Sequence, residues 1–322
     1  MSTNTAPFTV QPKLTQIALA IKPQDMIADL VCPRVPVEGE KFIYTKFTTS
    51  EVFTIPDTKV GRTSEPNQVE FGAVDVTDST EDHGLDDVVP NKDVMAAAAF
   101  KTNFDPFEQA AENTTILLEL AREQRVANLL FNLNTYQVPL RATLSGTSQW
   151  SDFTNSDPLA AILNAMDLML MRPTDICYGQ LAWTKFRTHP KVVAAVLNRS
   201  GGLGGLNAAG WATREAVAQL LELKMVHVGA SFSNGAKPGQ AAAYTRLWGK
   251  HCAMWRIERG VRSARSPLPT FSFTAQYGTR VAGTIAEPKK GLHGSQIVRV
   301  GEQVKELVSF QECGYFFQNV VA

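Results

Sequence analysis

The stretch NFDPFEQAAENTTILLELAREQRVANLLFN, residues 103–132, decides the fold because it predicts one unusually long helix. Asp105 and Glu108 form a capping box at its start, and Pro106 takes the first helical position. The chain then runs to about Phe131 without Gly or Pro. At roughly 1.5 Å per residue such a helix is about 40 Å long, which indicates the spine of an elongated lobe.

One side of this helix is expected to pack under strands that return from the C-terminal part of the chain. We predict that Leu117, Leu120 and Ala121 lie on that buried side. A charge placed there would be buried without a partner and would prevent folding.

The residues before the spine helix predict an arm followed by a β ribbon. Five prolines lie between Pro7 and Pro36, which indicates an arm laid over another surface. From Lys41 to Asp78 the segments KFIYTKF, EVFTI and VEFGAVDV are rich in β-branched and aromatic residues, and PDTKVGRTSEPN interrupts them. A two-stranded ribbon is marginal alone in water, so it needs a partner surface.

The residues after the spine helix predict a compact α/β lobe and then more strands. Asp157-Pro158 starts a second helix that ends before Pro173, and short strands and helices alternate up to CAMWRIE, with the polar SFSNGAKPGQ as a loop. Within the lobe, LNRSGGLGGLNAAGW (197–211) joins two predicted helices. Its glycines therefore indicate a mobile loop rather than a phosphate cradle. After Pro269 the segments TFSFTAQYG, QIVRV and KELVSFQECGYFFQNVV are again strand-like.

Composition bounds the class of protein. The 322 residues are 44% hydrophobic and 19% charged, which indicates a globular chain with a sizeable core. The 31 basic and 31 acidic residues cancel, which argues against a dedicated nucleic-acid binder and favours association. Cysteines 32, 177, 252 and 313 are too scattered for a zinc ribbon or a disulfide framework. Neither a secretory signal nor a membrane-spanning apolar run is present.

The sequence predicts no catalytic, cofactor-binding or metal-binding residues. It holds no H-E-x-x-H and no G-x-S-x-G motif, and histidines 83, 189, 227, 251 and 293 occur singly. His251 and Cys252 are adjacent, but no second pair accompanies them. Each histidine is therefore expected to be structural or solvated.

Acidic and basic residues are concentrated in two different segments of the chain. Asp75 to Asp93 holds seven acids and one lysine without the spacing of a calcium loop, so it is expected to be solvated or intermolecular. Arg246 to Arg265 holds six bases and one acid. Trp248 and Trp255 in that segment could stack nucleic-acid bases, although tryptophans in such strands are more often core. We expect the acidic segment of one copy to face basic residues of a neighbouring copy.

The order of arm, β ribbon, spine helix, α/β lobe and returning strands resembles the major capsid (head) protein of tailed bacteriophages, within the lambda-type group. FIYTKFTTSEVFTIPDTKVGRTSEPNQVEFG, the spine helix, SDPLAAILNAMDLM and LAWTKFRTHPKVVAAVL carry the likeness, which covers most of the chain. It implies an α+β, Hong Kong 97-like fold. The implied parts are an N-terminal arm (1–40), an extended E-loop (41–90), a P-domain with the spine helix (91–150), an axial A-domain (151–260) and a return to the P-domain with C-terminal strands (261–322).

The resemblance implies a structural, non-enzymatic protein that self-assembles through hexamers and pentamers into an icosahedral shell around double-stranded DNA. Portal, scaffolding and decoration proteins are implied partners, with weak non-specific contact to packaged DNA and no membrane partner. The implied location is the virion, after assembly in the bacterial host cytoplasm. Because the sequence starts directly with the arm, any scaffolding is expected from a separate chain. The loop Gly201–Gly205 is expected to vary between subunits.

Three alternatives stay open at this point. Some capsids of this fold crosslink a lysine to a neighbour's asparagine, and Lys46, Lys59 and Asn319 are the candidates here, although no motif aligns them. An encapsulin-like compartment shell would share the fold. A soluble α/β enzyme with an unrecognised site would not assemble at all.

Overall fold

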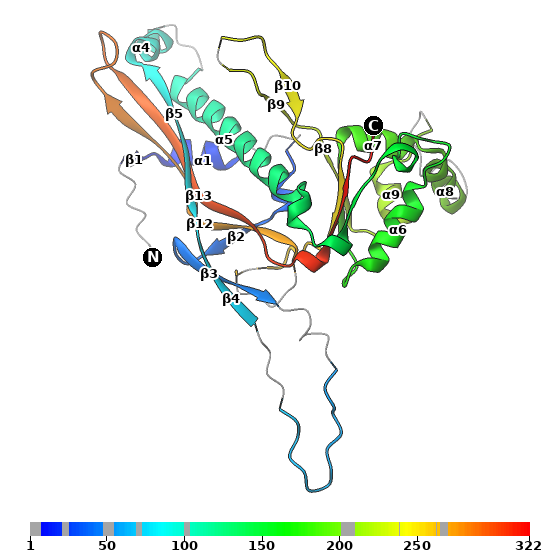
Figure 1. The fold of residues 1–322 in the computed structure, drawn as a ribbon. Coiled ribbons are helices and arrows are strands. Elements are labelled where there is room, and N and C mark those ends of the chain that lie inside the picture. Colours follow the sequence, from blue (N-terminus) through cyan, green and yellow to red (C-terminus); the bar gives the residue numbers. More distant parts are fainter. Residues whose placement is uncertain are drawn as a thin grey trace.

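The computed structural model describes residues 8–20, 26–47, 55–68, 73–99, 104–200, 210–237, 239–261, 263–264 and 270–322. An elongated sheet backed by one long helix, α5 (Pro106–Leu130), joins a compact lobe built around a second sheet (Figure 1). A thin loop, residues 55–68, hangs away from both parts, and a short hairpin projects on the opposite side. The architecture is α+β, as predicted.

Helix α5 begins and ends close to where the sequence predicts. The Asp105 carboxylate accepts a hydrogen bond from the Phe107 N–H at 2.9 Å, and Pro106 is the first helical residue. Glu108 forms an ion pair with Lys13 of α1 (Pro12–Ala20). The cap that starts the helix is therefore confirmed, while Glu108 ties the helix to the N-terminal segment.

The prediction of which side of α5 is buried is wrong. Leu117 is 56% exposed, Ala121 is exposed and Leu120 is only half-buried. The buried face instead consists of Ala110, Ala111, Thr114, Thr115, Leu118, Arg122, Glu123, Val126, Ala127 and Leu130. Four of these ten side chains are polar. The face of α5 that is buried is therefore less apolar than the adjacent face that the sequence predicted to be buried.

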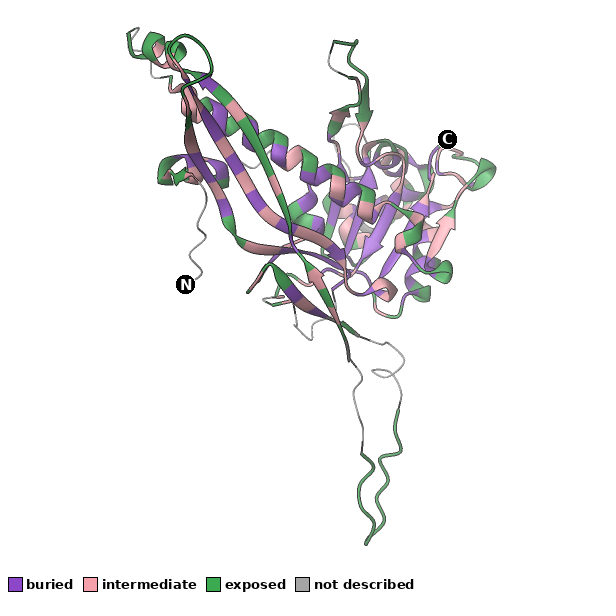
Figure 2. Cartoon of the chain, turned by 60° about the vertical axis from the view of Figure 1, so that its left-hand side comes forward, coloured by how far each residue is buried: buried purple, intermediate pink, exposed green. Residues whose placement is uncertain are grey.

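Three long antiparallel strands form the centre of the elongated sheet: β12 (Ser272–Glu287), β13 (Ser295–Val308) and β5 (Glu81–Pro90). Two short N-terminal strands, β1 (Thr9–Val10) and β2 (Arg34–Val37), both pair with β12. Helix α5 packs on β13 and β5, and α1 packs on β12. Buried and partly buried residues alternate along much of β13 (Figure 2), because strand side chains point to opposite faces.

The compact lobe surrounds a second sheet with strand order β6, β14, β11, β7, β8. Its strands are β6 (Arg141–Thr143), β14 (Gly314–Gln318), β11 (Cys252–Trp255), β7 (Asp175–Gly179) and β8 (Met225–Gly229). Helices α6 (Pro158–Leu168), α7 (Gln180–Thr188), α8 (Pro190–Ser200) and α9 (Arg214–Leu220) accompany this sheet. The Asp157 cap confirms the predicted start of α6. All five residues of β7 are buried, as expected for a central strand.

Two segments pair elsewhere than the sequence suggested. Residues 81–90, expected at the extended loop, form β5 of the elongated sheet. The last strand, β14, does not join the other returning strands, because it pairs with β11 and β6 of the lobe. The chain therefore crosses back into the lobe at its end.

The remaining elements are short. The ribbon consists of β3 (Lys41–Phe47) and β4 (Ala73–Ser79), and a hairpin consists of β9 (Phe232–Asn234) and β10 (Tyr244–Arg246). The other helices are α2 (Ala28–Val31), α4 (Asn91–Ala99) and the 3-10 turns η1 (Leu133–Thr135), η2 (Val138–Leu140), η3 (Gly146–Ser148) and η5 (Gln311–Cys313). The Gly201–Gly205 loop and most of EVFTI lie outside the described residues.

Candidate assembly surfaces

The extended loop, residues 55–68, is exposed along its whole length. Ile55 is 91% exposed, and the loop's own hydrogen bonds include Ser64 N–H to the Gly61 carbonyl and the Asn67 amide to the Asp57 carbonyl. Figure 1 shows it reaching beyond the rest of the chain. A segment that buries nothing of its own cannot repay the entropy of holding one shape, so its form depends on a surface outside the subunit.

The root of this loop is, by contrast, firmly packed. Phe42 and Tyr44 of β3 are each 6% exposed and belong to a cluster with Phe273 and Leu307 of the elongated sheet. The Tyr44 and Phe273 rings meet edge to face at 6.3 Å. The ribbon therefore fixes the direction in which the loop leaves the body.

Glu123 of α5 joins three separate parts of the chain. Its carboxylate accepts hydrogen bonds from the backbone N–H groups of Ile27 and Ala28, from the Trp248 indole at 2.6 Å and from the Ser231 hydroxyl. Burial raises the pKa of Glu123, although these donors oppose the rise. The arrangement holds the N-terminal segment and the root of the β9–β10 hairpin on the spine helix.

A second buried network ties the same segment to the elongated sheet. Glu302 of β13 accepts hydrogen bonds from Arg34 at 2.7 Å and from Arg280 at 2.8 Å, and both arginines also bind Glu119 of α5. Burial alone would raise the pKa of Glu302, but the two arginine charges outweigh it and lower that pKa. Arg122, fully buried on α5, binds Asp29 and the Cys32 carbonyl.

The lobe contains a buried acid and histidine that could be mistaken for a catalytic pair. Asp175 Oδ1 lies 2.8 Å from His227 Nε2 and 2.6 Å from Arg259, and its other oxygen accepts from Thr174. Burial opposes ionisation of Asp175, but His227, Arg259 and Thr174 together lower its pKa. All of the partners stabilise the carboxylate, which suits a structural ion pair.

A serine and a histidine also meet in the lobe, at 3.1 Å between Ser156 Oγ and His189 Nε2. His189 Nδ1 accepts the Lys191 N–H, so the neutral ring carries its proton on Nε2. Nε2 therefore donates to Ser156 and does not act as a base for that hydroxyl. Burial also lowers the pKa of His189. The pair lacks the arrangement of a serine nucleophile and its base.

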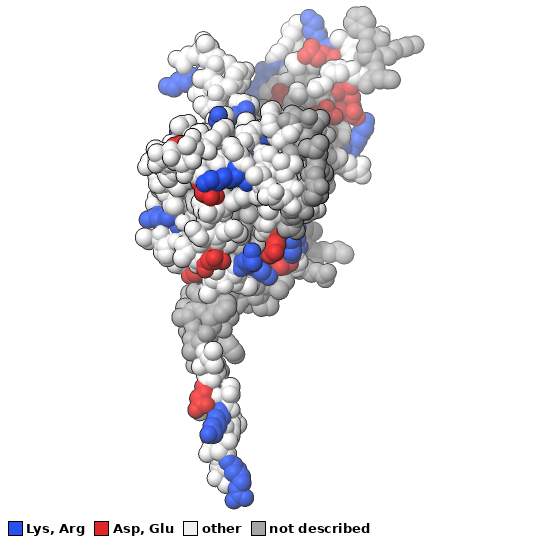
Figure 3. All heavy atoms as spheres, turned by 90° about the vertical axis from the view of Figure 1, so that its right-hand side faces the viewer, with Lys and Arg blue, Asp and Glu red and all other residues white. Residues whose placement is uncertain are grey.

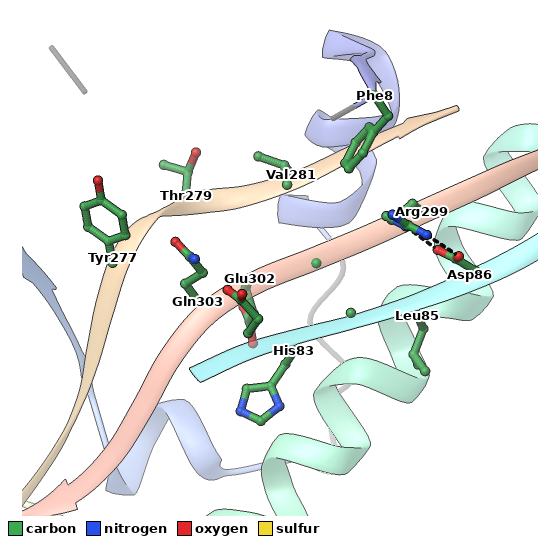
Figure 4. Close-up of a pocket in the computed structure, with 13 residues that line it drawn as sticks. Phe8, His83, Leu85, Asp86, Tyr277, Thr279, Val281, Arg299, Glu302 and Gln303 are labelled. Carbon is green, nitrogen blue, oxygen red and sulfur yellow. Dashed lines mark hydrogen bonds and ion pairs between the residues drawn. The ribbon is translucent and has the colours of Figure 1, made fainter. Parts of the chain in front are cut away.

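A surface hollow of about 570 Å³ lies on the elongated sheet. Gly84 and Gly301 pair directly across β5 and β13, and without side chains they leave the hollow open. Phe8, Val281, Tyr277, Gln303 and the Asp86–Arg299 ion pair surround it, while His83 and Leu85 point away from these side chains (Figure 4). Two of its acids, Asp86 and Glu302, are already paired with arginines, which leaves them poorly placed for acid–base work.

The two charged segments are partly neutralised within the chain. In the acidic segment Asp86 pairs with Arg299 and Glu81 with Lys305, both on β13. In the basic segment Arg259 pairs with Asp175, whereas Arg246 stacks on Phe232 at 4.2 Å and keeps its charge. Arg262 and Arg265 lie outside the described residues. The charges available for contact between subunits are therefore fewer than the sequence indicated.

The other residues singled out in the sequence have structural surroundings. Trp248 and Trp255 are fully buried, so they are core residues as expected, and all four cysteines are buried and free. His251 accepts the Asn319 N–H, and the His293 carbonyl accepts from Asn91. Asn319 has a φ of 55°, and its carbonyl accepts from Gln149. Lys46 is exposed on β3 and Lys59 on the extended loop.

Sequence reasoning missed β9 and hence the hairpin, because β9 lies in SFSNGAKPGQ (231–240), which was predicted to be a loop. The signal was present, because Asn234-Gly235 is a strong turn dipeptide. It also missed Arg122 and Glu123, because nothing local marks a charged residue on a helix as buried.

The far end of the lobe presents a mostly uncharged face with a few scattered charges (Figure 3). Such a face suits contact between identical copies, since few like charges are brought together. Within the described ranges, no cluster of three or more His, Cys, Asp or Glu residues is arranged to hold a metal ion, and no helix is long and apolar enough to span a bilayer.

A projecting loop, a spine helix under a long-stranded sheet and a compact lobe are the parts of a Hong Kong 97-like fold. The chain is 45% identical over 317 residues to the major capsid protein of Pseudomonas phage JBD67, covering 98% of this chain and 99% of that protein. A phage-related protein from Bordetella bronchiseptica has the same fold, with a TM-score of 0.74, 18% identity and coverage of 97% and 98%. The capsid of cyanophage P-SCSP1u matches at a TM-score of 0.54 with 10% identity, covering 89% of this chain and 86% of that one.

No family model matches the sequence. The relative at 45% identity nevertheless spans almost the whole of both chains. The chain therefore belongs to the family of phage major capsid proteins, and its role is structural. This membership favours a capsid over the compartment shell and the soluble enzyme that the sequence left open.

Proposed function

We propose that this chain assembles through hexamers and pentamers into an icosahedral phage head that encloses double-stranded DNA. One observation carries the proposal beyond family membership: the extended loop is fully exposed and reaches past its own subunit. A protein that functioned as a monomer would gain nothing from such a loop. In a shell, the loop would gain its ordering from a neighbouring copy.

The positions of the projections favour closed rings. The extended loop and the β9–β10 hairpin project on opposite sides of the molecule in Figures 1 and 2. Two different surfaces on opposite sides form a heterologous contact, which closes into a ring when the rotation between copies allows. Rings of five and six copies are the units that an icosahedral shell requires.

We further propose the division into arm (1–40), extended loop with its ribbon (41–90), P-domain (91–150), A-domain (151–260) and returning strands (261–322), with β5 and β14 paired as described above. The proposed partners are portal, scaffolding and decoration proteins, and the contact with packaged DNA is weak. Assembly takes place in the host cytoplasm. The role is non-enzymatic. The likeness to a phage major capsid protein over almost the whole chain supports these proposals.

Negative-stain microscopy of the purified chain tests the proposal. We expect closed shells or tubes made of ring-shaped units. Discrete small oligomers at every ionic strength and protein concentration, also with the other head proteins co-expressed, would overturn it. Uniform small cages filled with a protein cargo and free of DNA would support the compartment function instead.

A further inference from the structure

The β9–β10 hairpin is an arm without a core of its own. Phe232 is 47% exposed and Tyr244 is 71% exposed. The Asn234 side-chain oxygen accepts the N–H groups of Ala236 and Ala243, at 3.1 and 2.9 Å, and the Gly235 N–H binds the Ala243 carbonyl. The turn is therefore organised in advance, although two strands alone are only marginally stable in water.

The root of the hairpin is fixed on the spine helix. Ser231 precedes β9 and Trp248 follows β10, and both donate to the buried Glu123 carboxylate of α5. The Leu247 N–H closes the root on the Ser231 carbonyl, and Arg246 binds the Ala230 carbonyl while its guanidinium lies over the Phe232 ring. These contacts give the arm a set direction, which lowers the entropy cost of binding another surface.

The chemistry of the arm points to an acidic partner. Residues 230–249 contain two bases, Lys237 and Arg246, and no acid, so their net charge is +2. The exposed Phe232 and Tyr244 add aromatic surface beside those charges. Aromatic and arginine side chains are enriched in contacts between proteins.

A fitting acidic surface lies on the other side of the molecule, at the ribbon base, defined as residues 38–46 and 73–82. It carries six acids and two bases, a net charge of −4: Glu38, Glu40, Asp75, Asp78, Glu81 and Asp82 against Lys41 and Lys46. Glu40 and Asp82 are exposed and form no ion pair with other described residues. The charges of Glu40 and Asp82 are thus available to a partner, whereas Glu81 is already paired with Lys305.

We propose that the β9–β10 hairpin of one copy docks on the ribbon base of the next copy in a ring. The hairpin and the ribbon lie on opposite sides of the subunit (Figures 1 and 2), which is the placement that a head-to-tail contact requires. The opposite charges of the two surfaces would orient successive copies and speed correct docking. This contact rests on the proposed shell function and adds a second arm to the extended loop.

A charge swap tests the contact. One variant carries Lys237→Glu and Arg246→Glu, which changes the hairpin from +2 to −2. A second carries Glu38→Lys, Glu40→Lys and Asp82→Lys, which changes the ribbon base from −4 to +2, and a third combines all five changes. Because every copy in a ring carries both surfaces, the combined variant restores opposite charges at each contact. Arg214→Glu with Lys224→Glu is the charge-matched control on exposed residues of the same lobe. If the loss of the Arg246 stacking on Phe232 disturbs folding, the variant Lys237→Glu alone still tests the charge of the hairpin.

Assembly rate is measured by light scattering, with thermal melting to confirm folding. We expect each variant changed on one surface to assemble about fivefold or more slowly at low salt, the control to be unaffected, and the combined variant to recover to within about twofold of the unmodified chain. The differences should shrink as salt screens them. If the unmodified chain assembles but the swap does not restore the rate, or hairpin variants assemble normally, the contact is wrong while the shell function stands. If no variant and no unmodified chain forms shells, the shell function itself fails.

Discussion

At the scale of single residues, two buried glutamates show how the same side chain can have opposite pKa shifts. Glu302 faces two arginines, whose charges lower its pKa despite burial. Glu123 is surrounded by neutral donors, so burial prevails and its pKa is raised. Neutral hydrogen bonds are weaker than full opposite charges at stabilising a carboxylate away from water.

These shifts predict opposite pH dependences. A lowered pKa in the folded state means that the unfolded chain binds more protons, so Glu302 stabilises above the unfolded pKa and that stability is lost as pH falls through the lowered value. Glu302→Gln should therefore cost about 3 kcal/mol at neutral pH, and the cost should start to shrink only as the pH falls below about 4, the ordinary range of a glutamate. For Glu123 the raised pKa gives stability that is lost as pH rises through it, so the cost of Glu123→Gln should not shrink on acidification. Urea unfolding of the unassembled chain at several pH values measures both, and parallel curves for the two variants would contradict the assignment.

At the scale of elements, local signals predicted where helices start but not which side is buried. Asp-Pro pairs located the starts of α5 and α6, since a cap and a first-turn proline act within one turn. The buried face of α5 depends on partners far away in the sequence. Arg122 is held by Asp29 and Glu123 by Ile27 and Trp248, 93 to 125 positions away. No local pattern contains that information, and the same limit hid the root of the β9–β10 hairpin.

Two adjacent leucines on α5 test the buried face. Leu118 is 3% exposed and packs in the core beneath the elongated sheet, whereas Leu117 is 56% exposed. Leu118→Asp should bury an unpaired charge and cost about 4 kcal/mol or more, while Leu117→Asp should change the unfolding free energy by only about 0.5 kcal/mol. Both variants replace a leucine of α5 by aspartate at adjacent positions, so each one controls for the effect of the substitution on the helix itself. Equal loss of folded protein in both would show that the buried face is assigned wrongly.

At the scale of the whole molecule, the parts that pack the core are separate from the loop that we propose contacts a neighbouring copy. The packed clusters lie in the lobe, along α5 and at the root of the ribbon, whereas residues 55–68 contribute no buried side chain. Differences in composition predicted an arm, a ribbon with its loop, a spine helix and a lobe in that order. The surface that we propose for the loop could not be predicted, since the residues of the loop do not specify a partner.

This division predicts that the extended loop can be removed without cost to the fold. Replacing residues 55–68 by a short Gly-Ser link should leave the unfolding free energy within about 0.5 kcal/mol, because shortening a loop changes closure entropy only slightly. The same variant should form no closed shells, since each subunit loses its reach to a neighbour. A second variant keeps the length of the loop but scrambles its sequence. If this variant forms shells, the length of the loop is what assembly requires. If it does not, assembly requires specific side chains of the loop. Normal shells from the shortened chain, seen by microscopy beside an unchanged melting curve, would show that the loop is dispensable for assembly.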